Sequence, residues 1–316
     1  MTKAKFKTFW DKFGTLGILI LIMACLSIAS PQYFLTMDNF KQIGLQSTVF
    51  ILLAFGEFFA ILLAGIDLSV GSVAALVGTI TAYLLMAEVA LPVAILVGLI
   101  AAVIFGSING FLINSLELHP FVVTLGTNTV FRGVTLLISN GSPIFGLPPG
   151  IKKIAGYVGG FPIPFIFALV VCVFLVWFTT KTVAARNLYA LGGNRQAAWY
   201  SGINIKRFTL LAHILSSFLA GVAGIIMVAR VGAAEPTAGE GYETFAIASC
   251  IIGGTSFFGG KGKIFGVLLG GLTIGTITNG LNILNVSSYW QKIAMGSLII
   301  ASVALEKVVG GTVKNS

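Results

Sequence analysis

The stretch ILLAGIDLSVGS, residues 61–72, places one carboxylate between two apolar runs. A membrane-spanning helix needs about 20 mainly apolar residues. Two such helices use most of residues 42–86 and leave only the segment GIDLS to connect them. The stretch therefore predicts two spanning helices joined by a short break.

The break is made of small and polar side chains. Asp67 or Ser69 can cap a helix that starts near Val70 by accepting hydrogen bonds from its free backbone amides. Glycine permits a sharp reversal or a close helix contact. We interpret the segment as a capped hairpin or a re-entrant break, with a direct role in solute passage as the alternative. Its structural residues are Gly65, Asp67, Ser69 and Gly71.

The whole chain has the composition of a membrane protein. Of its 316 residues, 57% are hydrophobic and 9% are charged, whereas soluble domains carry roughly 25% charged residues. Only helices and closed barrels satisfy their backbone in lipid, and the alternation typical of barrel strands is absent. The predicted class is an all-α polytopic membrane protein, a single transmembrane domain over residues 1–316 with some helices broken or re-entrant. Ten segments are apolar enough to span: 14–30, 42–64, 70–86, 92–114, 121–138, 163–180, 209–230, 242–258, 263–284 and 290–308.

Charge predicts how these segments are oriented. The interval 181–208 holds five basic residues and no acidic one, and the interval 231–243 holds three glutamates and no basic residue. Because cytoplasmic loops carry an excess of Lys and Arg, we expect the first interval and both termini in the cytoplasm and the second interval outside. Lys152 and Lys153 disagree, because they lie in a loop that the crossings place outside. The net charge of +9 reflects orientation, and we expect no nucleic-acid partner.

Two pairs of segments suggest an internal duplication. FGSINGFLI at 105–113 resembles IGTITNGLNI at 274–283, and AGIDLSVG at 64–71 matches GGTSFFGG at 253–260 in spacing. Transporters often derive from duplicated helix sets with broken helices at matching positions. Glycine-rich helices also acquire similarity by chance, so both interpretations stay open.

Several polar residues fall inside the predicted spans. An acidic side chain there costs about 2.5–3.5 kcal/mol on insertion scales, so Glu57 must face a partner, water or an interface. Arg132 is one candidate partner, although it can equally extend toward an interface. Asparagines on apolar helices either join helices by hydrogen bonds or line a path for a sugar-like solute. The candidates for a translocation path are Glu57, Asn109, Asn128, Arg132 and Asn279.

Motifs for catalysis or metal binding are missing from the sequence. The segment 253–263 fails the phosphate-loop pattern G-x4-G-K-[ST], because Thr255 stands at the first glycine position and Gly262 follows Lys261. His119 and His213 are isolated, so no paired metal site exists. We predict no catalytic residue, no metal site and no cofactor bound by this chain.

Eight blocks follow one another in order across nearly the whole chain: GIDLSVGS (65–72), NGFLI (109–113), RGVTLLISNGSPI (132–144), LYALGGN (188–194), SGINI (201–205), AEPTAGEGYE (234–243), GGTSFFGGKGKIFG (253–266) and NGLNILNVSSYWQ (279–291). In these blocks the chain resembles the membrane permeases of bacterial ATP-binding-cassette (ABC) sugar importers, in the ribose-type branch that includes ribose, xylose, arabinose and galactose permeases. The combination of GIDLSVGS with GGTS and GGKGK is specific, unlike a lone glycine motif.

The resemblance implies a subunit that forms the transmembrane path for a monosaccharide, a ribose-like pentose or a hexose, in the cytoplasmic (inner) membrane. Such a permease pairs with a second copy or a close homologue. A separate cytoplasmic ABC ATPase, which binds ATP and Mg, drives the path, and a periplasmic or tethered sugar-binding protein delivers the sugar. The loops 139–162 and 232–243 fall on the face expected to meet that protein.

The resemblance also assigns residues 182–208 to a cytoplasmic loop that docks on the ATPase. Two positions depart from the family pattern. Gln196 and Trp199 stand where an acidic and a basic residue are common, so docking would rely more on shape and aromatic contact. The expected docking residues are Arg195, Gln196, Ala197, Ala198, Gly202 and Lys206.

Two other functions compete with this one. Glu57 occupies a position that is often neutral in such permeases, and an ion-coupled secondary transporter would use Glu57 or Asp67 to bind the coupling proton. A membrane enzyme would need a cluster of catalytic carboxylates or histidines at one membrane face, which the sequence does not offer.

Overall fold

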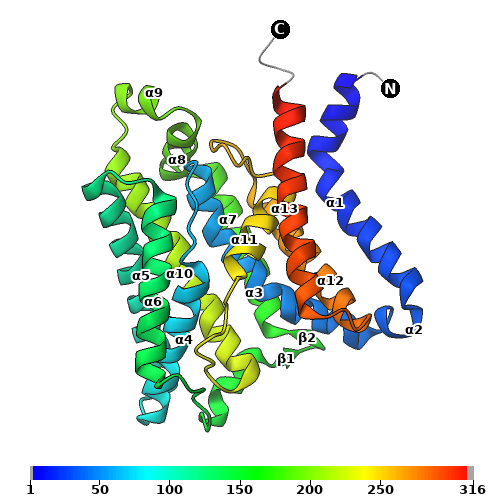
Figure 1. Ribbon diagram of the computed structural model, residues 1–316, viewed down its shortest axis with the longest axis vertical. Helices are drawn as coiled ribbons and strands as arrows, with labels where there is room; N and C mark the ends of the chain where they lie inside the picture. Colours follow the sequence, from blue (N-terminus) through cyan, green and yellow to red (C-terminus); the bar gives the residue numbers. More distant parts are fainter. Residues whose placement is uncertain (1–2, 312–316) are drawn as a thin grey trace.

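The computed structural model describes residues 3–311, and its main elements are helices (Figure 1). Ten helices correspond to the ten apolar segments: α1 (Lys3–Ala29), α3 (Met37–Leu62), α4 (Val70–Met86), α5 (Leu91–Leu116), α6 (Pro120–Ser139), α7 (Ile163–Lys181), α10 (Ile205–Val231), α11 (Tyr242–Ile252), α12 (Ile264–Ile283) and α13 (Ser288–Gly311). The connections contain α2 (Pro31–Phe34), the 3-10 helix η1 (Pro149–Ala155), α8 (Val183–Gly193), α9 (Arg195–Tyr200) and the antiparallel hairpin of β1 (Tyr157–Val158) and β2 (Phe161–Pro162).

Six of the described helices are long and apolar enough to cross a membrane, namely α3, α5, α6, α7, α10 and α12. Three shorter apolar helices join them: residues 14–29 of α1, α4 and α11. The prediction of a helical polytopic membrane protein is therefore confirmed, whereas the number of ten crossings stays a prediction.

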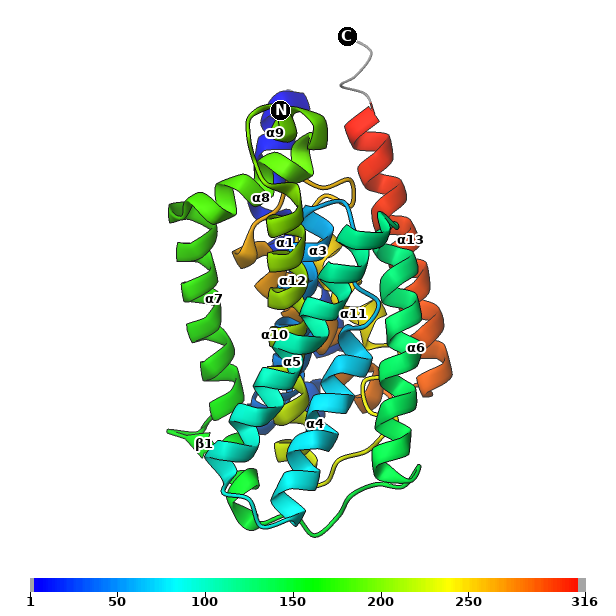
Figure 2. The same ribbon diagram turned by 90° about the vertical axis from the view of Figure 1, so that its left-hand side faces the viewer.

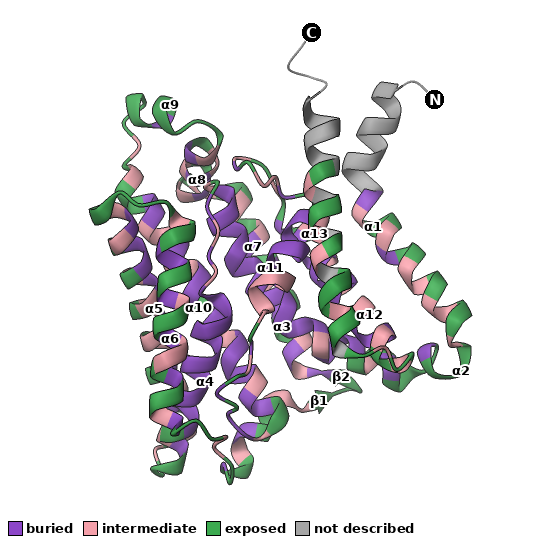
Figure 3. Cartoon of the chain, in the orientation of Figure 1, coloured by how far each residue is buried: buried purple, intermediate pink, exposed green. Residues whose placement is uncertain are grey.

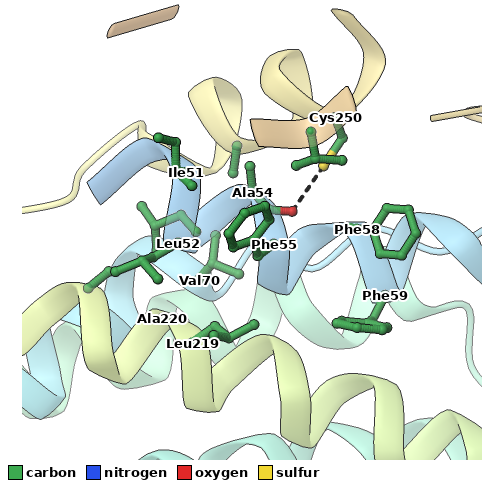
Figure 4. Packing of buried hydrophobic residues seen from close by; sticks show 14 of the residues in the cluster. Ile51, Leu52, Ala54, Phe55, Phe58, Phe59, Val70, Leu219, Ala220 and Cys250 are labelled. Carbon is green, nitrogen blue, oxygen red and sulfur yellow. Dashed lines mark hydrogen bonds between the residues drawn. The ribbon is translucent and has the colours of Figure 1, made fainter. Parts of the chain in front are cut away.

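Helix α3 is the centre of the bundle. Within its apolar window 94% of the residues are buried, against 22% for α7. Figure 3 shows buried residues inside the bundle and exposed residues along outer helices such as α6. Phe55, Phe58 and Phe59 of α3 are completely buried. The thiol of Cys250 on α11 donates a hydrogen bond to the Ala54 carbonyl oxygen at 3.1 Å (Figure 4). An apolar helix buried on all sides is typical of the interior of a membrane bundle.

The chain breaks after α3, as the sequence predicts, and the break is re-entrant. Residues 63–69 return from the end of α3 into the bundle, so that the backbone amide of Asp67 donates to Oε1 of Glu57, more than one turn before α3 ends. Helix α4 then begins inside the molecule and runs away from α8 and α9 (Figures 1 and 2).

The capping prediction is wrong for Ser69, whereas Asp67 accepts from the backbone amide of the residue that precedes α4. Ser69 does occupy the N-cap position of α4, but its side chain accepts no hydrogen bond from the first turn. Instead, the backbone amide and the hydroxyl of Ser69 both donate to Oδ1 of Asp67, at 3.0 and 2.5 Å. The carboxylate therefore orders the turn that precedes the helix.

A second, inverted copy of this arrangement follows in the chain. The segment 232–241 enters from the opposite end, and α11 runs from the interior toward α8 and α9 (Figures 1 and 2). In this copy α10 corresponds to α3, α11 to α4 and α12 to α5. Helix α10 packs on α5 and α4, and in the same way α3 packs on α12 and α11. The sets α3–α6 and α10–α13 are therefore related as an inverted repeat, a common plan in transporters.

The repeat confirms one predicted correspondence and corrects the other. Residues 105–113 and 274–283 lie in the equivalent helices α5 and α12. Residues 64–71 and 253–260 are not equivalent, because the first segment precedes α4 and the second follows α11. The structural counterpart of the first break is the segment 232–241.

The two ends of the molecule carry different elements. Helix α1 begins and α13 ends at the end of the bundle that carries α8 and α9, whereas the β hairpin lies toward the other end (Figures 1 and 2). Which end faces the cytoplasm stays a prediction.

Candidate functional site

Asp67 is the centre of a polar cluster buried between helices. Its Oδ1 accepts the two hydrogen bonds from Ser69, and its Oδ2 lies 3.5 Å from Nδ1 of His213 on α10. Asn109 of α5 donates from Nδ2 to Oγ of Ser69 at 2.9 Å. All four residues are at most 2% exposed. The cluster joins the re-entrant segment to α5 and α10.

Glu57 and Thr124 tie the same segment to two further helices. Oε1 of Glu57 accepts from the Asp67 amide at 3.1 Å. On α6, Oγ1 of Thr124 accepts from the Leu68 amide at 3.1 Å and lies 3.0 Å from the Ile66 carbonyl oxygen, to which it can donate. Four helices therefore hold seven residues of non-helical backbone inside the bundle, in accord with the requirement that such backbone be satisfied there.

Several polar atoms in and beside the cluster have no hydrogen-bond partner within residues 3–311. Oε2 of Glu57, Oδ1 of Asn109 and the hydroxyl of Ser216 are buried and have no hydrogen-bond partner among the described residues. Unsatisfied buried atoms are uncommon and require an explanation. No group of three His, Cys, Asp or Glu side chains in the described ranges is arranged to hold a metal ion.

Arg132 is not the partner of Glu57. Its Nη1 donates to the carbonyl oxygens of Pro236 and Ala238, at 2.6 and 2.9 Å. An antiparallel bridge between Ile144 and Ala234 adds hydrogen bonds of 2.9 and 3.0 Å. Arg132 holds the segment 232–241 against α6, and the bridge holds it against the loop that follows α6.

The remaining candidates for a translocation path are dispersed. Asn279 of α12 donates from Nδ2 to Oδ1 of Asn39 at 2.9 Å and so joins α12 to α3. Asn128 is partly buried on α6. Of the five predicted residues, only Glu57 and Asn109 belong to the polar cluster. The sequence analysis missed His213, although a lone histidine in an apolar helix was the available signal.

The predicted docking segment is an exposed tip with a defined shape. Asn194 caps α9, because its Oδ1 accepts from the Ala197 amide at 2.9 Å. Gly202 ends the turn at φ +78°, a left-handed conformation that favours glycine, and its amide donates to the Trp199 carbonyl oxygen at 3.0 Å. Trp199 and Tyr200 are 62% and 79% exposed, with ring centroids 5.0 Å apart.

The other docking candidates surround this aromatic pair. Arg195, Gln196 and Ala197 are exposed, but Ala198 faces the interior of its own chain and is 3% exposed. Lys206 is exposed on α10, and its carbonyl oxygen accepts from Nδ2 of Asn114 at 2.7 Å. A groove of about 940 Å³ separates α9 from the turn between α5 and α6, and its lining includes Asn114, Glu117, His119, Trp199, Gly202 and Lys206.

The comparisons with known proteins agree with this architecture. The family described as branched-chain amino acid transport system / permease component matches residues 39–303. The D-allose transport system permease protein of Escherichia coli (strain K12) is 53% identical over 96% of this chain and 94% of its own length. The ribose import permease protein of Bacillus subtilis (strain 168) is 42% identical over 92% of this chain and 91% of its own length. The galactose/methyl galactoside import permease protein of Salmonella typhimurium is 34% identical over 98% of this chain and 97% of its own length.

No solved structure matches the chain. The family match covers most of the described residues, and the relatives align over almost their full length. Together with the apolar helices, this makes the chain a multi-pass membrane protein and a transport subunit. It belongs to the branched-chain amino acid transport system / permease component family and, within it, to the ribose-type sugar permeases.

Proposed function

We propose that the chain is the permease subunit of an ATP-driven importer that moves a monosaccharide across the cytoplasmic (inner) membrane. The observation that carries the proposal is the 53% identity to a D-allose permease over 96% of the chain. D-allose is therefore the first sugar to test, and D-ribose is the second. Residues 1–316 form one permease domain, which pairs with a second copy or a close homologue.

The partners follow from the same proposal. A cytoplasmic ABC ATPase binds and hydrolyses ATP with Mg, and it receives α9 within the docking loop 182–208. The exposed Trp199 and Tyr200 support this assignment, because exposed aromatic side chains are enriched at protein interfaces. A periplasmic or tethered sugar-binding protein meets the opposite end, at the loops 139–162 and 232–243. Arg195, Gln196, Ala197, Gly202 and Lys206 supply the docking surface, and Ala198 positions it from inside.

The mechanism is alternating access driven from α9. Helix α10 begins at Ile205, within the docking loop 182–208 and separated from the end of α9 by four residues, so a displacement of α9 is passed to α10. Helix α10 packs on α5 and α4 and reaches the re-entrant segment through His213 and Asp67. ATP can shift the equilibrium between two conformations of the complex only if it binds more tightly to one of them. The re-entrant segment is then the element that the motion of α10 displaces.

Reconstitution of the importer tests this function. The chain is placed in proteoliposomes with the ATPase and the binding protein from its own cells, and uptake of D-allose and D-ribose is measured with ATP supplied to the ATPase. We expect uptake to require ATP and to stop with an ATPase that binds but does not hydrolyse ATP. Uptake that continues with this ATPase and stops with a protonophore would replace the proposal by ion coupling.

A further inference from the structure

Helix α8 is the shorter of the two connections between the docking helix α9 and the bundle. Helix α8 ends at Gly193 and α9 begins at Arg195, so only Asn194 separates them. By contrast, four residues separate α9 from α10 on its other side. Leu188 and Leu191 of α8 are buried in the hydrophobic core of the bundle. A displacement of α9 therefore acts directly on α8 and, through it, on the core.

The last turn of α8 lies against the point where α3 ends and the re-entrant segment begins. A Cβ atom on Gly192 would collide with the Leu62 carbonyl oxygen, so the backbones of α8 and α3 are in contact there. The same carbonyl oxygen accepts a hydrogen bond from the Gly260 amide at 2.9 Å. The last carbonyl groups of a helix have no partner within the helix. Here the loop 253–263, which joins α11 to α12, supplies one.

Tyr189 holds that loop against α8. Its hydroxyl group donates to the Gly262 carbonyl oxygen at 2.9 Å, and its ring packs edge-on against Phe58 of α3, with ring centroids 6.4 Å apart. A Cβ atom on Gly259 would stand 2.9 Å from the Ala64 nitrogen, so the loop also lies against the first residues of the break. The loop is therefore fixed both to α8 and to the re-entrant segment.

These contacts join three segments at one place, which we call the joint: residues 189–193 of α8, residues 62–64 and the loop 253–263. Residues 62–64 belong to the set α3–α6 and the loop belongs to the set α10–α13, whereas α8 lies between the two sets in the chain. Helix α8 therefore contacts both halves of the inverted repeat. The approach of His213 to Asp67 reaches the break from α10 alone.

We propose that Tyr189 and Gly192 are positioning residues for transport, because they hold the three segments together as a joint that moves with the docked α9. A movement of α9 then displaces the re-entrant segment and the connection between α11 and α12 in the same step. The inference rests on the proposed ATP-driven import and adds the contacts that couple ATP hydrolysis to it. Both residues are partly buried and lie outside the proposed docking surface, so changing them leaves that surface intact.

Two substitutions test the joint in proteoliposomes that contain the complete importer. Tyr189→Phe keeps the ring contact with Phe58 and removes the hydrogen bond to Gly262, and Gly192→Ala forces α8 away from Leu62. We expect both complexes to retain the ATPase on purification and to hydrolyse ATP. We expect them to transport several-fold less sugar per ATP hydrolysed than the wild type. The hydrolysis that counts is the part stimulated by the binding protein with the transported sugar, D-allose or D-ribose.

Gly193→Ala is the matched control. Gly193 follows Gly192 in the same helix, and a Cβ atom there meets nothing within 4 Å, so its ratio of sugar to ATP should equal that of the wild type. This ratio distinguishes coupling from stability, because a loss of folded complex lowers uptake and stimulated hydrolysis together. If Gly192→Ala does not assemble, Tyr189→Phe alone tests the joint.

Hydrogen exchange supplies a second, independent measurement. An ATPase that binds ATP without hydrolysing it holds the importer in its ATP-bound conformation. We expect ATP to change the exchange of the backbone amides in residues 63–69 of the wild type, and we expect Tyr189→Phe to reduce this change several-fold. An equal change in Tyr189→Phe, or no change in the wild type, would overturn the joint.

The outcomes separate this inference from the proposed function. The joint is overturned if Tyr189→Phe transports as much sugar per ATP as the wild type, if its uptake and hydrolysis fall in proportion, or if it loses the ATPase on purification. An equal loss of coupling in Gly193→Ala also overturns it. In each of these cases the wild-type importer still works. A wild-type complex that takes up neither sugar with ATP shows instead that the proposed function is wrong.

Discussion

Gly71 and Gly239 lie against each other where the two inverted halves of the protein meet. A Cβ atom on Gly239 would stand 2.7 Å from the Gly71 carbonyl oxygen, and a Cβ atom on Gly71 would collide with the Gly239 carbonyl oxygen. Gly239 also adopts φ +72°, which side chains rarely tolerate. The N-terminal end of α4 and the segment that precedes α11 can approach this closely only because both residues are glycine.

Because of this contact, we expect a single methyl group added at Gly239 to lower both stability and uptake. Gly239→Ala adds overpacking of about 1–3 kcal/mol and left-handed strain of about 1–2 kcal/mol, so we expect a lower melting temperature in detergent and loss of uptake. The control is Gly126→Ala on α6, where a Cβ atom meets nothing within 4 Å. Equal melting temperatures and uptake for the two variants would mean that the crossing is not tight in the working protein.

Glu57 is predicted to act as a hydrogen-bond acceptor. Glu57→Gln keeps an oxygen that can accept from the Asp67 amide, so we expect uptake near the wild-type level across the neutral and mildly acidic range. Glu57→Ala leaves that buried amide unpaired at a cost of about 1–3 kcal/mol and should lower the melting temperature. A loss of uptake in Glu57→Gln, with stability unchanged, would show that the charge itself is required.

Arg132 is predicted to order the outer loop. Each hydrogen bond from its charged guanidinium contributes about 1.5–3 kcal/mol, so Arg132→Gln should increase hydrogen exchange in the segment 232–241 and reduce uptake. Arg132→Lys keeps one charged donor and should give an intermediate result. Unchanged exchange in this segment would show that the bridge between Ile144 and Ala234 is sufficient to hold it.

Gly202 is predicted to matter for the ATPase and not for the fold. A Cβ atom at Gly202 meets nothing within 4 Å of its own chain, and Asn and Asp are the non-glycine residues that best tolerate its left-handed conformation. We expect Gly202→Asp to insert normally, to lose the ATPase on purification and to abolish uptake. Gly202→Asn tests size without charge. Normal uptake by Gly202→Asp would remove this segment from the mechanism.

The helices could be predicted from the sequence because lipid imposes long apolar runs with few charges. All ten predicted segments contain a helix, and the segment predicted to break does so between Leu62 and Val70. The hydrogen bonds at the break were harder to predict, because the hydroxyl group of Ser69 can either donate or accept. The structure uses it to donate to Asp67, whereas the capping prediction had it accept.

Contacts between distant segments could not be predicted. The partner of Arg132 proved to be backbone carbonyl groups, and backbone acceptors carry no signature in the sequence. The Gly71–Gly239 contact and the approach of His213 to Asp67 depend on how the two halves invert, which weak internal similarity does not specify. The docking segment was found through resemblance, and its exposed Trp199–Tyr200 pair depends on which face of α9 packs inward.

The most direct test of the account is the isolation of the chain with its partners from native membranes. The tagged protein is purified in mild detergent, the bound proteins are identified by mass spectrometry, and vanadate-sensitive ATP hydrolysis is measured for the wild type and for Gly202→Asp. We predict that the wild type carries a nucleotide-binding subunit and hydrolyses ATP, and that Gly202→Asp does neither. A wild-type chain that is repeatedly isolated alone and without ATPase activity would contradict the account.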